Sequence, residues 1–279
     1  MMKSFDPNKI SHRDLQNLLQ NIVTPRPIAF ASTIDADGNA NLSPFSFFNA
    51  FSSNPPILIF SPARKGRDGS LKHSYLNVKE VPEVVINMVN FDMVEQMSLA
   101  SAEFDRGVDE FKKAGLTPIK SLTVKPFRVK ESPVQFECVV NQVIELGTEG
   151  GAGNLVICQV NMIHVDSAAF NLAGEIDADI LDIVGRMGGS DYIKASGKAL
   201  FSIPKPINSI GIGVDALPEC IRTSEYLNGN ELARLGGLES LPIFDESYKP
   251  SIQDLLDAKE LIANNKIQEA LALLIRKIE

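Results

Sequence analysis

The fold is constrained most strongly by a series of short apolar runs, each of strand length, which turn-forming residues separate. The runs cover residues 28–34, 40–43, 45–51, 57–60 and 84–89. Asp35-Ala36-Asp37-Gly38-Asn39 predicts a hairpin turn after the first run, and the Pro55-Pro56 pair before the fourth cannot continue a central sheet ladder. Strands this short and closely spaced favour a barrel or sandwich over a parallel α/β sheet.

The apolar spacing becomes helical between residues 91 and 116. Apolar positions within 91–99 predict one helix, and those within 104–111 predict a second, which Gly115 and Pro118 end. These two segments are expected to be helical insertions in a mainly β chain.

A two-residue alternation then predicts two long paired strands. The first covers residues 134–141, where Glu137 faces away from the apolar side. Glu137 could act as a base, although a surface or structural hydrogen bond is the commoner role at such a position. A Gly-rich turn at 147–153 leads to a return strand over 155–165, whose even-numbered residues from Val156 to His164 are expected on one apolar face.

The pattern changes again near residue 203. Pro204, Pro206 and Pro218 predict an irregular segment. Ser251 is then expected to cap a helix over 252–263, and a second helix over 267–278 would complete a helical hairpin. The predicted organisation is a domain over 1–202 followed by a C-terminal extension over 203–279.

Charge and cysteine content exclude several classes of protein. The net charge of −8 and pI near 5.1 argue against a nucleic-acid binder, and the 44% hydrophobic content excludes a disordered chain. Cys138, Cys158 and Cys220 are too widely spaced for a disulfide framework or a zinc site, and the three histidines are not paired for metal binding.

The N-terminus lacks the apolar stretch of a signal peptide, and the apolar runs are too short to span a bilayer. The sequence therefore predicts a cytoplasmic protein with no nucleic-acid, membrane or metal partner.

Standard catalytic signatures are missing from the sequence. It contains no P-loop, no His-Glu-x-x-His and no Gly-x-Ser-x-Gly motif. Gly211-Ile212-Gly213 is too short for a dinucleotide fingerprint and is interpreted as a structural turn.

Positive evidence for a ligand lies between residues 43 and 77. The segment 43–52 combines hydroxyls, an amide and aromatic rings, which suits a flat heteroaromatic ligand, although the phenylalanines are also typical of a core. The loop that follows is locally basic and carries hydroxyls, so it suits a phosphate group. An ordinary solvated loop is the alternative interpretation. The loop residues in question are Ser61, Arg64, Lys65, Arg67, Lys72 and Ser74.

Several motifs, in order, resemble those of the flavin reductase-like, FMN-binding split-barrel family. The resemblance covers roughly residues 15–200 and implies an FMN-binding split β-barrel plus a C-terminal helical extension. It further implies a homodimer that holds FMN non-covalently near the subunit interface. The matching segments are Arg26-Pro27-Ile28-Ala29-Phe30-Ala31-Ser32, Asn41 to Asn49, Asn54-Pro55-Pro56, Lys72 to Asn77, Asp109-Glu110-Phe111, Ala114 to Pro118, and Arg186-Met187-Gly188-Gly189 with Tyr192.

The same resemblance implies a set of cofactor-binding residues. Lys72 and Ser74 match the lysine and threonine of the family's Lys-Asp-Thr motif, whereas His73 departs from it. His164 lies on a strand that in related proteins runs beside the cofactor. Arg186 and Tyr192 are expected to bind the cofactor. Alternatively, they are a structural pair that holds the C-terminal part of the barrel in place. The full expected set is Ser46, Phe47, Phe48, Asn49, Ser52, Ser61, Arg64, Lys72, Ser74, His164, Arg186 and Tyr192.

The function that follows from the resemblance is that of an FMN-binding oxidoreductase of the flavin reductase type. Electrons would pass from NAD(P)H through FMN to a small-molecule or protein acceptor, with NAD(P)H expected from the family alone. No catalytic residue is singled out, because the cofactor carries the chemistry. A non-enzymatic FMN-binding electron carrier is the alternative, and a barrel without flavin that serves as an interaction module is a third.

Overall fold

The computed structural model describes residues 1–203, 205 and 210–278. It divides into two compact units, Met1–Phe201 and Ser202–Glu279. Pro204 and Pro206, on which part of the predicted irregular segment rests, lie outside the described residues.

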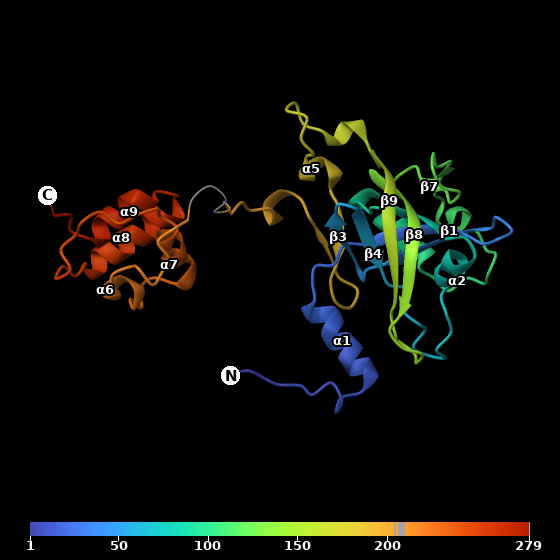
Figure 1. Cartoon of the computed structure of the whole chain (residues 1–279), viewed down its shortest axis with the longest axis horizontal. Helices are drawn as coiled ribbons and strands as arrows, with labels where there is room; N and C mark the ends of the chain where they lie inside the picture. Colours follow the sequence, from blue (N-terminus) through green and yellow to red (C-terminus); the bar gives the residue numbers. More distant parts are fainter. Residues whose placement is uncertain (204, 206–209, 279) are drawn as a thin grey trace. The chain divides into compact units, whose positions relative to one another are not determined.

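The first unit is built on a seven-stranded antiparallel sheet with the strand order β2-β1-β5-β8-β9-β4-β3 (Figure 1). The prediction of a mainly β chain with helical insertions is confirmed. The strands of this sheet are β1 (Ala29–Ile34), β2 (Ala40–Phe45), β3 (Phe48–Ser53), β4 (Pro56–Phe60), β5 (Glu83–Asn87), β8 (Val134–Glu145) and β9 (Asn154–Val165).

The sheet curls into a barrel that stays open between its two edge strands. β2 and β3 are the edges, although only Ser46 and Phe47 separate them in the sequence. Inside the curl, the Phe45 ring of β2 lies 5.5 Å from the Phe60 ring of β4, near the opposite edge. The chain therefore crosses an open seam at Ser46-Phe47, which is why the apolar run over 45–51 is not the single strand that the sequence predicts.

Both faces of β1 are buried, in two separate hydrophobic clusters. Ala29 and Ala31 face the interior of the barrel, where Val84, Cys138 and Val156 also lie. Phe30 faces the other way, into a second cluster that we call the outer cluster. It includes the helix residues Met97 and Phe111. Because β1 is packed on both sides, all six of its residues are buried.

Of the two helices predicted between residues 91 and 116, the first is observed and the second is shorter than predicted. The first predicted helix is η1 (Phe91–Met93) continued by α3 (Val94–Ala100). The second, α4 (Glu110–Ala114), begins only where the Asp109 side chain accepts hydrogen bonds from the backbone N–H groups of Phe111 and Lys112. It ends at Gly115, whose φ of 66° favours glycine. Residues 101–109 consequently form a loop.

A bulge in the pairing of β8 and β9 changes which residues share a face. Cys138 pairs with Val160, but Glu137 pairs with Met162, so Asn161 is an extra residue in β9. Beyond Asn161 the alternation is reversed, and His164 lies on the outer face with Glu137. The expectation that Val156 and His164 share one face is therefore wrong.

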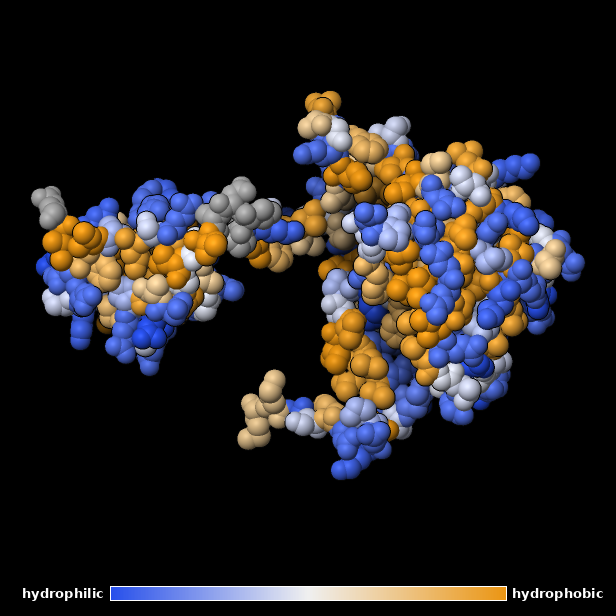
Figure 2. Space-filling view, viewed as in Figure 1, coloured by the Kyte–Doolittle hydropathy of each residue, from blue (hydrophilic) through white to orange (hydrophobic). Residues whose placement is uncertain are grey.

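The remaining elements of the first unit lie around this sheet. α1 begins after its capping residue Ser11 and has no buried residue, and Figure 2 shows hydrophobic surface where this helix lies. α2 sends Val78 into the barrel interior. The bounds are α1 (His12–Ile22), α2 (His73–Glu80), β6 (Pro118–Ile119) paired with β7 (Arg128–Val129), η2 (Ser167–Ala169), α5 (Ala178–Leu181), β10 (Val184–Arg186) paired with β11 (Tyr192–Lys194), and η3 (Gly197–Ala199).

The second unit consists of short helices around a hydrophobic cluster of its own. Ser251 and Asp254 form the predicted capping box at the start of α8. The next helix ends at Leu274, four residues before the predicted end. The helices are α6 (Glu219–Arg222), α7 (Gly229–Gly236), α8 (Ile252–Ala263) and α9 (Ile267–Leu274).

The Gly211-Ile212-Gly213 segment, which the sequence predicts to be a structural turn, is instead an extended piece of backbone that lies beside residues 236–238. The Ile212 N–H donates to the Leu238 carbonyl at 2.8 Å, and the Gly213 N–H donates to the Gly236 carbonyl at 2.9 Å. A Cβ atom on Gly211 would lie 2.5 Å from the Gly236 carbonyl oxygen, so the close approach of these backbones requires glycine. Among the described residues, no helix combines the length and apolar character needed to cross a membrane.

Candidate functional site

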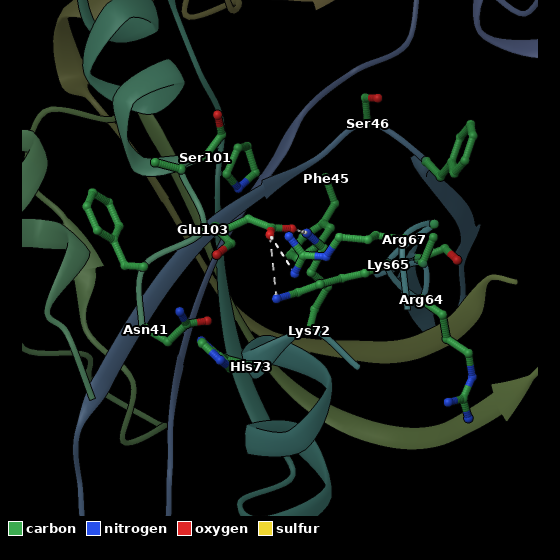
Figure 3. Close-up of a pocket in the computed structure, with 18 of the residues that line it drawn as sticks. Asn41, Phe45, Ser46, Arg64, Lys65, Arg67, Lys72, His73, Ser101 and Glu103 are labelled. Carbon is green, nitrogen blue, oxygen red and sulfur yellow. Dashed lines mark hydrogen bonds and ion pairs between the residues drawn. The ribbon is translucent and has the colours of Figure 1, made fainter. Parts of the chain in front are cut away.

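A pocket of the first unit lies where β2 ends and has a volume of about 370 Å³. It is lined by the end of β2 and the connection to β3, by the loop over 61–72, by residues 101–104 and by two glutamines of α1. Figure 3 shows these segments converging on one cavity. The β2–β3 seam carries aromatic and hydroxyl side chains, whereas the loop over 61–72 is basic. Both segments line the same site.

Three cations of the basic loop converge on one carboxylate in this pocket (Figure 3). The Glu103 carboxylate lies 3.3 Å from Lys72 Nζ, 3.7 Å from Lys65 Nζ and 3.9 Å from Arg67 Nη2. The hydrogen bond from Lys72, followed by the charges of the nearby cations, lowers the pKa of Glu103. The cluster therefore attracts an anion, as its composition predicts for a phosphate.

Arg64 lines the same pocket, but its guanidinium points away from this cluster (Figure 3). Its Nη2 lies 3.1 Å from Glu145, and its Nη1 donates to the Gly69 carbonyl at 3.3 Å. Tyr75 donates its hydroxyl proton to the same carboxylate of Glu145 at 2.6 Å. The Arg64 Nε is buried without a hydrogen-bond partner, which leaves one donor unused.

His73 lies at the start of α2, directly after Lys72, and lines the pocket. Burial, together with the neighbouring charges of Lys65 and Arg106, lowers the pKa of His73. An uncharged imidazole is thus favoured here, beside cations that would repel a charged one.

A buried hydrogen-bond chain lies behind the pocket. Ser74 donates its hydroxyl proton to Asn41 Oδ1 at 2.7 Å, and Asn41 Nδ2 donates to Glu110 Oε1 at 2.8 Å. The other oxygen of Glu110 accepts from the Leu42 N–H at 3.0 Å. Burial is the main reason that the pKa of Glu110 is raised. In this arrangement the only proton of Ser74 is directed to Asn41, so Ser74 supports the pocket wall.

Five of the predicted binding residues are brought together in this pocket. Ser46 and Phe47 lie at the seam, where the Ser46 hydroxyl is 3.4 Å from Nε of the buried Arg26. Ser61 lies beside Phe47, because its N–H donates to the Phe47 carbonyl at 2.9 Å, and its hydroxyl accepts from the Asn154 N–H at 3.1 Å. The five residues are Ser46, Phe47, Ser61, Arg64 and Lys72.

Three predicted residues lie along the edge strand β3, beyond the pocket lining. Phe48 packs against the barrel interior. Asn49 is exposed, and Ser52 accepts a hydrogen bond from the Asn54 N–H at 3.3 Å.

Arg186 and Tyr192 form a cation–π pair, with the guanidinium 4.5 Å from the ring centre. Arg186 also donates to the carbonyls of Gly189 and Asp191. Tyr192 lines a separate apolar groove with Phe91. The structure does not bring this pair to the pocket.

His164 lies on the outer face of the barrel, beside Glu137. Its Nε2 is 2.7 Å from Glu137 Oε1, and the Glu137 side chain is completely buried. Burial by itself raises the pKa of Glu137, but hydrogen bonds from Leu122, Thr123 and His164 outweigh burial and lower the pKa to about 2. Arg128 Nε adds a cation 3.6 Å away. The structure thus gives Glu137 the structural hydrogen-bonding role that the sequence left open.

Several residues of the pocket were not singled out from the sequence as site residues. Glu110 and Asn41 belong to matched family segments, and their buried polar side chains could have been noticed there. Glu103 and Ser101 carry no such signal, because a glutamate in a turn is ordinarily solvated. Gln16 and Gln20 reach the pocket only because α1 lies beside it.

Comparison with known proteins places this split barrel in a family. Residues 22–174 match the model of the flavin reductase like domain. An uncharacterized protein of Aquifex aeolicus is 35% identical over 189 residues, which are 68% of this chain and 94% of that protein. The crystal structure of nitrilotriacetate monooxygenase component B from Bacillus cereus superposes with a TM-score of 0.68 at 31% identity, over 73% of this chain and 99% of that one. A split-barrel structure from Shewanella frigidimarina has a TM-score of 0.61 at 26% identity, over 73% of this chain and 100% of that one.

The fold and the pocket define a split-barrel protein of the flavin-linked oxidoreductase class. The chain belongs to the flavin reductase-like domain family, which confirms the resemblance read from its motifs. Residues 202–279 lie beyond the matched range.

Proposed function

We propose that this protein binds FMN in the pocket at the end of β2 and acts as an oxidoreductase that moves electrons from NAD(P)H to an acceptor. The observation that supports this most directly is the convergence of Lys65, Arg67 and Lys72 at one part of a cavity that also carries aromatic and hydroxyl side chains. A ligand that combines a flat ring system with a phosphate suits both parts. NAD(P)H as the donor is inferred from the family.

The pocket fits such a ligand in size and in donor set. Its volume of about 370 Å³ lies within the range of small-molecule sites. Phe45 and Phe47 supply apolar surface, and the hydroxyls of Ser46 and Ser101 supply polar edges.

When bound, FMN supplies the hydride and electron transfer itself. The residues of the chain bind and orient it. Lys65, Arg67 and Lys72 hold the anionic end, while Glu110 fixes β2 by accepting from Asn41 and Leu42, and so keeps the seam residues in place. Buried hydrogen bonds of this kind keep a binding wall rigid.

Replacing Lys72 with alanine is expected to weaken FMN binding about tenfold, because one charge-assisted bond to the phosphate is lost. Riboflavin, which has the same ring but no phosphate, should bind with nearly unchanged affinity. Quenching of flavin fluorescence on titration with the protein measures both dissociation constants. Lys79→Ala removes the same charge from the last turn of α2 and serves as the matched control.

Equal losses for both flavins would contradict the assignment of the phosphate to this cluster. Steady-state NAD(P)H oxidation by the FMN-loaded protein, with free flavin as acceptor, separates an enzyme from an electron carrier. A protein that holds FMN but does not oxidise NAD(P)H is the carrier.

We also propose a homodimer in which a second copy covers β3 and α1. β3 is an edge strand that carries exposed Phe51, and Phe47, the residue before this strand, is also exposed. α1 exposes Leu19 and Ile22. Apolar side chains on an edge strand and a helix with no buried residue are typical of a surface that a partner covers.

The Phe51→Asp variant is therefore expected to be monomeric at concentrations where the unchanged chain is dimeric, because a carboxylate would be buried in the interface. Multi-angle light scattering measures the mass of each. Leu122→Asp, on the loop that covers β8, is the control and should leave the mass unchanged. An unchanged chain that is monomeric would contradict the proposal.

A further inference from the structure

The Glu103 carboxylate occupies the centre of the cation cluster. It is contributed by the loop over 101–109, whereas its three partners come from the loop over 61–72. The carboxylate thus bridges two loops on opposite sides of the pocket, as the dashed contacts in Figure 3 show.

The contacts of Glu103 are of the kind that a better anion can replace. Its side chain is 47% exposed, and all three separations exceed the usual length of a charge-assisted hydrogen bond. Exposed ion pairs contribute little, because solvent screens them and two long side chains must be held in place. One carboxylate also neutralises only one of the three positive charges, whereas a phosphate monoester carries nearly two negative charges.

We propose that Glu103 is an internal competitor for the phosphate-bearing end of the ligand and determines how strongly the site prefers a phosphorylated flavin. The proposal rests on the proposed function, since it assumes that the phosphate is bound by this cluster. Glu103 holds the cations together in the ligand-free protein. It must leave them, or share them at the cost of repulsion between like charges, when a phosphate arrives.

An organising role for Glu103 predicts the opposite effect. If the carboxylate were needed to align Lys65, Arg67 and Lys72, its removal would let the three side chains separate, and phosphate binding would weaken. The sign of the change in affinity therefore distinguishes the two roles.

The experiment measures dissociation constants of FMN and riboflavin for the full-length, flavin-free chain and for Glu103→Gln. The glutamine variant is expected to bind FMN up to about fivefold more tightly, with riboflavin unchanged, because an exposed ion pair is worth no more than this. Glu103→Asp keeps the charge and should stay close to the unchanged chain. Glu95→Gln removes one negative charge from an exposed position of α3, outside the lining of this pocket, and controls for net charge.

Each outcome has one interpretation. Weaker or unchanged FMN binding by Glu103→Gln, in a chain that still prefers FMN to riboflavin, overturns the competitor role and leaves the proposed function intact. The same gain in Glu95→Gln also overturns it, because net charge alone would then explain the effect. An unchanged chain that binds both flavins equally overturns the proposed phosphate site instead.

Discussion

Replacing Glu137 with glutamine is expected to lower the free energy of unfolding by about 3 kcal/mol at pH 7. The carboxylate is fully buried and accepts from the Leu122 N–H at 2.8 Å and from the Thr123 N–H at 2.6 Å. A glutamine amide would direct its own N–H groups at one of these donors. A buried N–H group that loses its acceptor has no water to replace it. This costs more free energy than the hydrogen bond itself contributes to stability.

The same substitution should also change how stability depends on pH. The pKa of Glu137 is lowered from 4.5 to about 2 in the folded chain, so the ionised form stabilises the fold. This contribution is complete above pH 4.5 or so and is lost as the pH falls towards 2. The difference between the unchanged chain and Glu137→Gln should therefore shrink over that range.

Urea denaturation at a series of pH values between 7 and 3 measures this difference. Glu83→Gln is the matched control, because Glu83 lies on the neighbouring strand and accepts one hydrogen bond from the Lys125 N–H of the same covering segment. Its effect should stay below about 1 kcal/mol. Curves for the unchanged chain and Glu137→Gln that run parallel down to acid pH would contradict the assigned role of Glu137.

Replacing Phe111 with alanine is expected to destabilise the first unit by about 3–5 kcal/mol. Phe111 is only 1% exposed and packs in the outer cluster with Phe30, Met97 and other large side chains. Truncating its ring would leave a cavity that the helices cannot fill without losing other contacts. The midpoint of urea unfolding, followed by circular dichroism, measures the loss.

The loss at Phe111 should extend to the pocket, because Glu110 is the adjacent residue of α4. Flavin affinity of the folded fraction is thus expected to fall with the alanine variant. Phe111→Leu keeps most of the apolar volume and should lose less than half as much stability. Equal effects of leucine and alanine would contradict a cavity as the cause.

Local periodicity predicted most of the strands of the sheet, because their alternation reflects burial that neighbouring residues share. It could not show where that alternation is interrupted. The run over 45–51 is uniformly rich in aromatic residues, yet the chain leaves one edge strand at Phe45 and enters the other at Phe48. The alternation predicted that Glu137 lies on the face of its strand opposite the apolar one. The segment over 117–130 covers the face that carries Glu137 and buries this side chain.

The candidate site was predicted in its composition better than in its geometry. The basic loop does gather cations in a pocket, and Lys72 makes the shortest of their three contacts with Glu103. Arg64 turns away because Glu145, eighty-one positions later in the chain, pairs with it. Long-range pairs of this kind, like the contact of Glu103 with Lys72, leave no periodic signal in a single sequence.

The extra residue at Asn161 reverses, for the rest of β9, which side chains face the interior of the barrel. Upstream of it, even-numbered side chains belong to the barrel interior; downstream, Met162 and His164 belong to the outside. Deleting Asn161 would restore a single parity and send the imidazole of His164 inward, away from Glu137. Asn161 belongs to neither hydrophobic cluster of the first unit. Its presence nevertheless decides whether the imidazole of His164 faces the interior of the barrel or its outer face.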